Sequence, residues 1–285
     1  MNAYLELGTV NRLKIVRETP HGLVLASEKE KEVLLPKRYV TETMKIGDTL
    51  DVFLYTDSEE RIVATTERPR AMLGEVAEME VVDLTPHGAF VDWGLPKDLF
   101  VPRMLQKEPM HRGECHAILV TYDEKSHRLA GTQKFDRQLA KASSKTLKRN
   151  EAVDAYIFGK TELGYKAVVN RRYEGLIFHS EVFGPLAVGD TVTAYVKQVR
   201  DDGKIDLLTR PIGKKSDNLA ADKVMAWLHD HNGMLPLNYK SDPERIKELL
   251  GLSRKNFKRA LTKLIEAGKI EVKENGTYLR MKNGK

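Results

Sequence analysis

The sequence contains a single cysteine, Cys115, and only two tryptophans. One cysteine can form neither an internal disulfide nor a cysteine-based zinc cluster. No apolar run approaches the length of about eighteen residues that a membrane-spanning helix needs. The first residues, MNAYLELGTVNRLKIV, lack the basic, apolar and small-residue order of a secretion signal. We therefore expect a cytoplasmic protein that does not bind a membrane.

The charge of the chain is unevenly distributed along its 285 residues, a length that suits two to four domains. Lys plus Arg against Asp plus Glu number 10 against 12 in residues 1–68 and 9 against 11 in residues 69–138. They number 12 against 9 in residues 139–212 and 16 against 9 in residues 213–285. This asymmetry favours a polyanionic partner for the C-terminal half, although a lysine-rich solvated surface explains the charge alone equally well.

A turn followed by an alternating segment occurs three times. TPHGLVL starts at Thr19, TPHGAFV starts at Thr85, and TELGYKAVV starts at Thr161. In each copy a second glycine follows the first after 25 residues; the pairs are Gly22 with Gly47, Gly88 with Gly113, and Gly164 with Gly189. Period-2 alternation between glycine turns predicts short strands, and three copies in the same frame indicate a tandem repeat.

Each copy has room for about five strands, which suits a small closed barrel. The OB-fold is the common barrel of this size, and its open face binds single-stranded nucleic acid. The sequence therefore predicts a mainly β, multidomain chain with three tandem OB-fold barrels, in residues 1–68, 69–138 and 139–212.

After residue 212 the apolar period becomes that of a helix. Helices are predicted within residues 219–233, 241–251 and 253–268, with caps at Asp242 and Ser253 and stops at Gly251 and Gly268. A hairpin turning at Asn275–Gly276 follows. This order of elements predicts a winged helix-turn-helix domain in residues 213–285.

Two segments resemble the S1-type RNA-binding domain. GEVAEMEVVDLTPHGAFVDWG, residues 74–94, resembles the opening of that domain, and EGLIFHSEVF, residues 174–183, resembles its third strand. The first copy keeps the frame without the aromatic residues. Three such copies and a winged helix resemble the conserved virulence factor B family of bacterial RNA-binding proteins over essentially the whole chain. The resemblance implies regulation of gene expression after transcription, including virulence regulation.

The S1 resemblance also implies where RNA would bind: aromatic rings on the second and third strands and a basic residue on the last. The candidates in the third copy, the strongest, are Tyr165, Lys166, Arg171, Arg172, Phe178, His179 and Arg210. Strand alternation predicts that only one of Phe178 and His179 faces outward, and we favour Phe178. The weaker candidates in the second copy are His87, Phe90, Trp93 and Lys134, although Phe90 equally suits a barrel core. The first copy offers a single possible stacking ring, His21, and its last strand ends in the acidic Glu67, so we expect no RNA binding there.

The third helix of the C-terminal domain is in the recognition position and is rich in cations. They are Arg254, Lys255, Lys258, Arg259 and Lys263. These side chains would meet phosphates and read little sequence. A solvated helix face or a protein-docking surface is the alternative.

We expect a non-catalytic protein whose partner is single-stranded RNA, in an mRNA or on the ribosome, and which is a monomer without metal or cofactor. The alternative is a transcription regulator that binds duplex DNA through the winged helix. An enzyme is not expected, because no catalytic domain, metal-ligand spacing or glycine-rich phosphate loop is present. Turn chemistry before Gly203 explains the carboxylate pair Asp201–Asp202. The segment 141–151 reads either as a stiff helix or as a loose linker.

Overall fold

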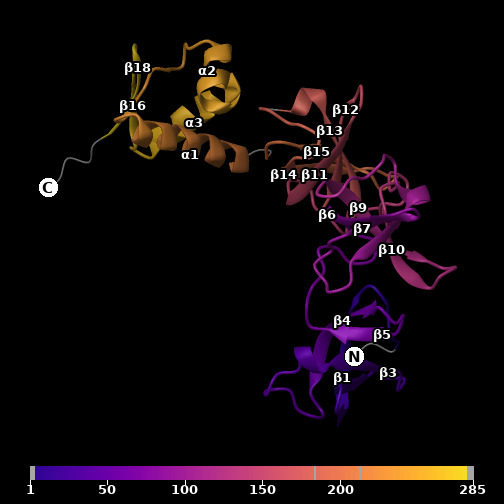
Figure 1. Cartoon of the computed structure of the whole chain (residues 1–285). Coiled ribbons are helices and arrows are strands. Elements are labelled where there is room, and N and C mark those ends of the chain that lie inside the picture. Colours follow the sequence, from indigo (N-terminus) through magenta and orange to yellow (C-terminus); the bar gives the residue numbers. More distant parts are fainter. Residues whose placement is uncertain (1–3, 183, 212–213, 281–285) are drawn as a thin grey trace. The chain divides into compact units, whose positions relative to one another are not determined.

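The computed structural model describes residues 4–182, 184–211 and 214–280 (Figure 1). The chain divides into two compact units. The first comprises Met1–Lys141 with Val168–Glu174, and the second comprises Ala142–Ala167 with Gly175–Lys285. Among the described helices, none combines the length and the apolar character that crossing a membrane requires.

The first five strands form a closed barrel. They are β1 (Val10–Thr19), β2 (Gly22–Ala26), β3 (Glu32–Pro36), β4 (Thr49–Thr56) and β5 (Ile62–Thr65), and a short 3-10 helix, η1 (Lys37–Tyr39), follows β3. Their order around the barrel is β1-β2-β3-β5-β4, and only the β3–β5 ladder is parallel among the ladders of this barrel. Leu13 and Ile15 of β1 are fully buried and Lys14 between them is exposed, so the alternation in the sequence places alternate side chains in the barrel core.

The second set of five strands repeats this arrangement. They are β6 (Val76–Thr85), β7 (Gly88–Val91), β8 (Leu99–Pro102), β9 (Cys115–Asp123) and β10 (Arg128–Thr132), with η2 (Arg103–Leu105) after β8. The hydrogen-bonded order β10-β9-β6-β7-β8 makes an open five-stranded sheet.

The third set closes again into a barrel. It consists of β11 (Ala152–Lys160), β12 (Gly164–Val169), β13 (Tyr173–Phe178), β14 (Thr191–Val199) and β15 (Ile205–Leu208), with η3 (His179–Glu181) after β13. The order β11-β12-β13-β15-β14 is that of the first barrel. The predicted succession of three small β-barrels is therefore confirmed, with the middle one closed less completely, while the exact domain boundaries stay predictions.

The two glycines of each repeat serve different purposes. At Gly22, Gly88 and Gly164, a Cβ atom would lie 2.0, 2.3 and 2.1 Å from a carbonyl oxygen of the third strand, so only glycine lets that strand approach. The later glycines, Gly47, Gly113 and Gly189, have φ values of +101°, +84° and +98° and open space around them. These glycines recur in the three copies because the turn before the fourth strand has a positive φ, a conformation that favours glycine.

Segment 141–151 is neither a stiff helix nor a loose linker. Its described residues form turns, and Ala142 and Leu147 within it are buried. Glu151 closes one of these turns by accepting from the backbone N–H of Lys148 at 2.7 Å. Because Ala142 and Leu147 are buried, this segment is an ordered connection although it forms no helix.

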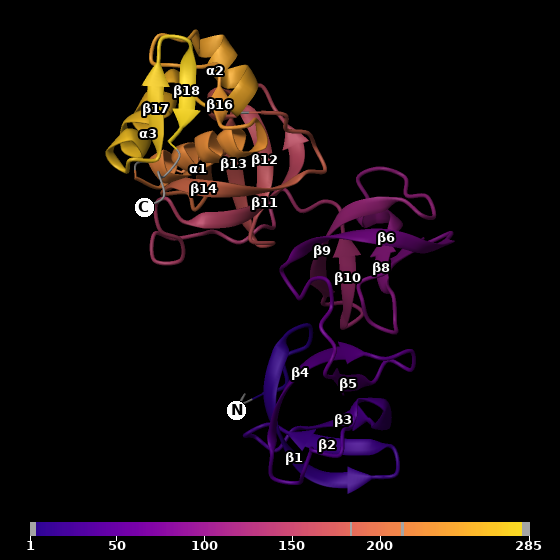
Figure 2. The same cartoon turned by 90° about the vertical axis from the view of Figure 1, so that its left-hand side faces the viewer.

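The last domain folds as a winged helix, as predicted. Its elements are α1 (Lys214–Asp230), β16 (Met234–Leu235), α2 (Pro243–Leu250), α3 (Arg254–Glu266), β17 (Ile270–Lys273) and β18 (Gly276–Leu279). Asp242 caps α2, Ser253 caps α3, and Gly251 ends α2 in the left-handed conformation. Figure 2 shows β17 and β18 side by side as the wing, and β16 completes the sheet in the order β16-β18-β17.

Candidate nucleic-acid interface

Strands β12 and β13 place two aromatic rings on the outside of the third barrel. Tyr165 follows the turn glycine of β12, and Phe178 ends β13; both rings are half-buried. Ile177, the neighbour of Phe178, is fully buried. Because adjacent strand residues point to opposite faces, the burial of Ile177 directs Phe178 outward. The second and third strands form the face that OB-folds use to bind oligonucleotides.

His179 joins this aromatic surface from the start of η3. Its ring centroid lies 5.3 Å from that of Tyr165, with an edge-on angle of 76°. Its Nε2 donates to the carbonyl oxygen of Thr161 at 2.9 Å. The expectation that only one of Phe178 and His179 is accessible was wrong. Strand β13 ends at Phe178, so the two-residue alternation does not continue into the turn, and the exposed His179 accompanies the half-buried Phe178.

Three cations lie over aromatic rings of the third barrel. The pairs are Lys160 over Tyr165, Lys166 over Phe158 and Arg200 over Phe178, at 5.6, 5.9 and 5.7 Å from the ring centroids. Cations within about 6 Å of a ring face are attracted by its quadrupole. The arrangement therefore mixes flat rings with positive charge, which are the two components that a single strand needs from its binding surface.

Sequence reasoning missed Phe158, Lys160 and Arg200. The signal for Phe158 was present in AYIFGK, where Ile157 is buried and Phe158 lies half-buried in the opposite phase. The position of Arg200 could not be predicted from the sequence, because it depends on an ion pair with Asp206, a residue that is only 4% exposed. The Nε of Arg200 donates to Asp206 at 2.7 Å. This ion pair fixes the guanidinium beside the ring of Phe178.

Arg171 and Arg172 were expected to supply charge to RNA, but they contact the second barrel. The Nη1 of Arg171 donates to the carbonyl oxygen of Arg70 at 2.7 Å, and the Arg171 carbonyl accepts from the N–H of Val76. The Arg172 guanidinium lies 3.6 Å from the Glu75 carboxylate. Both arginines are exposed, and these contacts within the first compact unit tie the β12–β13 turn to the segment that precedes β6.

Arg210 is likewise engaged. It follows β15, is half-buried, and donates through Nη2 to the carbonyl oxygen of Gly251, the residue that ends α2. Burial lowers the pKa of the Arg210 guanidinium. Arg210 therefore connects the end of the third barrel to the C-terminal end of α2, and this hydrogen bond leaves its guanidinium less available to a phosphate.

The second barrel presents a smaller aromatic surface. His87 is exposed, and the half-buried Phe90 faces Phe100 across the β7–β8 ladder with ring centroids 5.1 Å apart. Phe90 is therefore no plug of the barrel interior, and Phe100 is an aromatic partner that sequence reasoning missed. Lys134 is exposed and its Nζ donates to the carbonyl oxygen of Met104 at 2.8 Å.

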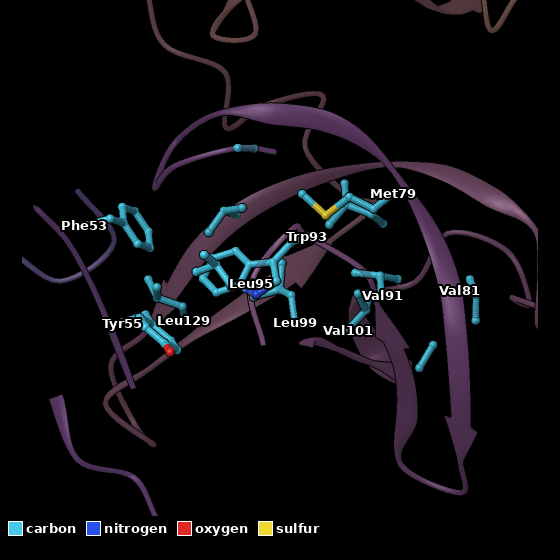
Figure 3. Packing of buried hydrophobic residues seen from close by; sticks show 14 of the residues in the cluster. Phe53, Tyr55, Met79, Val81, Val91, Trp93, Leu95, Leu99, Val101 and Leu129 are labelled. Atoms are coloured by element: carbon cyan, nitrogen blue, oxygen red, sulfur yellow. The ribbon is translucent and has the colours of Figure 1, made fainter. Parts of the chain in front are cut away.

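Trp93 does not present a ring for stacking, so its inclusion among the candidates was wrong. It is 3% exposed and belongs to a hydrophobic cluster that the first two barrels share. Phe53 of β4 meets it edge to face, with centroids 5.9 Å apart at 75°. Figure 3 shows Trp93 between the rings of Phe53 and Tyr55 and the side chains of the second barrel. The indole Nε1 donates to the carbonyl oxygen of Lys97, which satisfies its only polar group.

In the first barrel, the residues that would replace the S1 aromatics are mostly internal. His21 is exposed, whereas Leu23 beside the turn glycine is 4% exposed. Glu67 accepts a hydrogen bond of 3.0 Å from the hydroxyl of Tyr39, a side chain that is itself buried. This surface offers a single exposed ring near the turn and an acidic strand end.

Helix α3 separates its cations from its apolar residues. Its buried residues are Phe257, Ala260, Leu261 and Leu264. Four of the five candidate cations are exposed: Arg254, Lys255, Arg259 and Lys263, while Lys258 is half-buried. The Nζ of Lys263 donates to the side-chain oxygen of Asn218 in α1. The exposed face of α3 can therefore meet phosphates with at least three cations that its core packing does not use.

Among the described residues, no group of three or more His, Cys, Asp and Glu side chains is arranged to hold a metal ion. The third barrel presents rings together with cations, and α3 presents cations. Their chemistry is that of binding a polyanion with flat bases.

Comparison with known proteins gives two family matches. Residues 7–67 match the S1 domain, and residues 222–279 match the CvfB-like winged helix domain. The S1 match lies on the first barrel, the copy that keeps the repeat frame without the aromatic residues.

Relatives match most of the chain. The uncharacterized protein YitL of Bacillus subtilis (strain 168) is 28% identical over 273 residues, covering 93% of this chain and 91% of that protein. Conserved virulence factor B of Staphylococcus aureus (strain USA300) is 24% identical over 252 residues, covering 82% of this chain and 83% of that protein. The crystal structure of a multidomain protein with nucleic acid binding domains from Streptococcus pneumoniae TIGR4 is 25% identical, covers 96% of this chain and 98% of that chain, and has a TM-score of 0.42. The chain is therefore similar to the S1 domain in residues 7–67, to the CvfB-like winged helix domain in residues 222–279, and to conserved virulence factor B over 82% of its length.

Proposed function

We propose that the protein binds single-stranded RNA without catalysis and regulates gene expression after transcription, with its main grip on the third barrel and on α3. The observation that carries the proposal is the coincidence of two half-buried rings, Tyr165 on β12 and Phe178 on β13, with the cations that lie over them from neighbouring elements. Bases of any sequence can stack on such rings, and each stacked base contributes on the order of 1–3 kcal/mol.

The two modules would reinforce each other. The chain that connects the two surfaces raises the effective concentration of the second site once the first is occupied. The cations of α3 add a contribution to the affinity that depends on the salt concentration and not on the RNA sequence. The function therefore combines a stacking surface with an electrostatic one on the same RNA.

The test measures the affinity of the full chain for a labelled U-rich RNA by fluorescence anisotropy. The double variant Tyr165→Leu, Phe178→Leu removes both flat faces and keeps apolar volume. It should weaken binding by about tenfold or more, because at least one stacking contact is lost. Tyr122→Leu, which removes an exposed ring on the outside of β9, is the matched control and should bind like the unmodified chain.

Two results would contradict the proposal. Unchanged affinity in the double variant would show that the third barrel does not stack bases. Tighter binding of duplex DNA than of the single-stranded RNA, with no effect of the same variant, would favour the alternative of a transcription regulator that uses the winged helix.

A further inference from the structure

A cavity of about 430 Å³ lies at the surface of the third barrel, within the second compact unit. One wall is the ordered segment that precedes β11, and the other is the end of β14. Strands β11 and β14 pair with each other, which brings the two walls together (Figure 2). The lining residues are Ser144, Leu147, Lys148, Arg149, Lys197, Gln198 and Val199.

The lining contains three cations and no acidic residue. Lys148 and Arg149 are exposed, and within the described chain neither side chain pairs with a carboxylate. Lys197 differs, since its Nζ donates to Glu181 at 2.8 Å. The hydroxyl of Ser144 adds a further donor. Two cations that no carboxylate neutralises suit a phosphate group, whose oxygens accept several charge-assisted hydrogen bonds at once.

The backbone that carries the two unpaired cations is tied down on both sides. Directly before them, Leu147 is 4% exposed and its N–H donates to the carbonyl oxygen of Ser143 at 3.2 Å. Directly after them, the N–H of Asn150 donates to the carbonyl oxygen of Val196 in β14 at 2.7 Å. Because this backbone is held in place before an anion arrives, less conformational entropy is lost on binding.

A hydrogen-bonded network connects the cavity to the ring of Phe178. Gln198, which lines the cavity, donates through Nε2 to Asp206 at 2.7 Å. The same carboxylate accepts from the Nε of Arg200, which lies over Phe178. Phe178, Asp206 and Gln198 belong to neighbouring strands in the order β13-β15-β14. Two strand spacings of about 4.8 Å separate β13 from β14, so a few nucleotides can connect a base on the ring with a phosphate in the cavity.

We propose that this cavity binds the phosphate backbone of an RNA whose bases stack on the third barrel, through Lys148 and Arg149. The inference rests on the proposed function and deepens it, because it gives the RNA backbone a route from Phe178 across β15 and β14. The lining contains no aromatic residue, so a base would find no ring for stacking there. The cavity therefore contributes to affinity through charge and not through base recognition.

The experiment uses the full chain and the double variant Lys148→Gln, Arg149→Gln, called the cavity variant. Binding of a labelled U-rich RNA is measured by fluorescence anisotropy at several salt concentrations. Loss of one or two phosphate contacts on a single strand should make the slope of log affinity against log salt concentration shallower by about 0.7 to 1.4. Between about 50 and 200 mM salt, the unmodified chain should then lose about threefold to sevenfold more affinity than the cavity variant.

The same segment supplies a matched control. Residues 141–149 hold four cations and no acidic residue, and Lys141 and Lys145 are exposed without lining the cavity. The control variant Lys141→Gln, Lys145→Gln removes the same charge and should keep the slope of the unmodified chain. The exchange Lys148→Arg, Arg149→Lys keeps both charges in the cavity and should bind RNA like the unmodified chain. Equal unfolding midpoints of the three variants show that the fold is intact.

Each outcome decides for or against the cavity. A shallower slope in the cavity variant alone supports it. An unchanged slope in the cavity variant, or an equal change in the control variant, overturns it. Calorimetric titration of the full chain with pyrophosphate tests the other source of phosphate. Saturable pyrophosphate binding that the cavity variant abolishes, with the salt dependence of RNA binding unchanged, assigns the cavity to a free phosphate compound and overturns the RNA route.

The proposed function can fail separately from this inference. If Tyr165→Leu, Phe178→Leu binds RNA normally while the cavity variant has a shallower slope, the stacking surface is overturned and the phosphate contact in the cavity stands. If the ring variant binds RNA more weakly while the cavity variant keeps the slope of the unmodified chain, the cavity is overturned and the proposed function stands.

Discussion

Neutralising the exposed cations of α3 should change the salt dependence of RNA binding in a way that can be calculated. The perturbation is the triple variant Arg254→Gln, Lys255→Gln, Arg259→Gln, which removes three exposed charges and leaves the buried face of the helix untouched. Each phosphate neutralised on a single strand contributes about 0.7 to the slope of log affinity against log salt concentration. Loss of three contacts should therefore make the slope shallower by about 2.

The size of this effect makes it easy to measure. Between about 50 and 200 mM salt, a fourfold change, a slope difference of about 2 corresponds to a factor of about 16. The unmodified chain should thus lose about 16-fold more affinity over this range than the triple variant does. The assay is fluorescence anisotropy of a labelled U-rich RNA at several salt concentrations.

A matched control lies on the neighbouring helix. Arg245 and Lys247 of α2 are exposed and equally basic, and their double exchange to Gln should leave the slope unchanged. If the triple variant keeps the slope of the unmodified chain, the cations of α3 do not contact phosphates and the reasoning fails. If the control shifts the slope as much as the triple variant, the effect is one of general net charge and not of α3.

Three further predictions concern the architecture. Trp93→Ala should reduce the free energy of unfolding by about 3–5 kcal/mol, seen as a lower urea midpoint by circular dichroism, because it empties the shared core; a loss below about 1 kcal/mol would contradict that role. Gly164→Ala should destabilise strongly, since its Cβ would lie 2.1 Å from a carbonyl oxygen, whereas Gly159→Ala, with its nearest contacts at 3.9 Å, should melt within a few degrees of the parent; equal melting temperatures would refute the close-approach argument. The Arg70 guanidinium, together with a backbone N–H, holds the pKa of Asp92 below its usual value. That depressed pKa stabilises the fold above the unfolded-state value of about 3.9 and ceases to do so as the pH falls through the folded value. Asp92→Asn should therefore cost the same stability at pH 7 as at about pH 5 and progressively less below about pH 4, and a cost that grows on acidification would be the opposite of this expectation.

Some of the surface aromatic residues of the third barrel could be predicted from the sequence. Tyr165 and Phe178 were identified because strand periodicity and the turn glycine both lie within a few residues of them. Phe158 could have been identified in the same way. His179 was misjudged, because the end of a strand depends on where its neighbours stop pairing, and that is a property of the sheet.

The wing turn lies at Glu274–Asn275, one residue before the predicted Asn275–Gly276, because Gly276 already pairs with Lys273 in the β17–β18 ladder. The succession of three glycine-framed barrels and the helix caps at Asp242 and Ser253 could be predicted from the sequence alone. These features depend on interactions within a few residues, so local propensity and periodicity are sufficient to predict them. Which rings and cations are accessible depends on contacts between residues far apart in the chain. Trp93 lies in a core shared with Phe53, and Arg171 donates to a carbonyl oxygen 101 residues away in the chain. Such partners are brought together by the packing of one barrel against another, and no local pattern in the sequence records that packing.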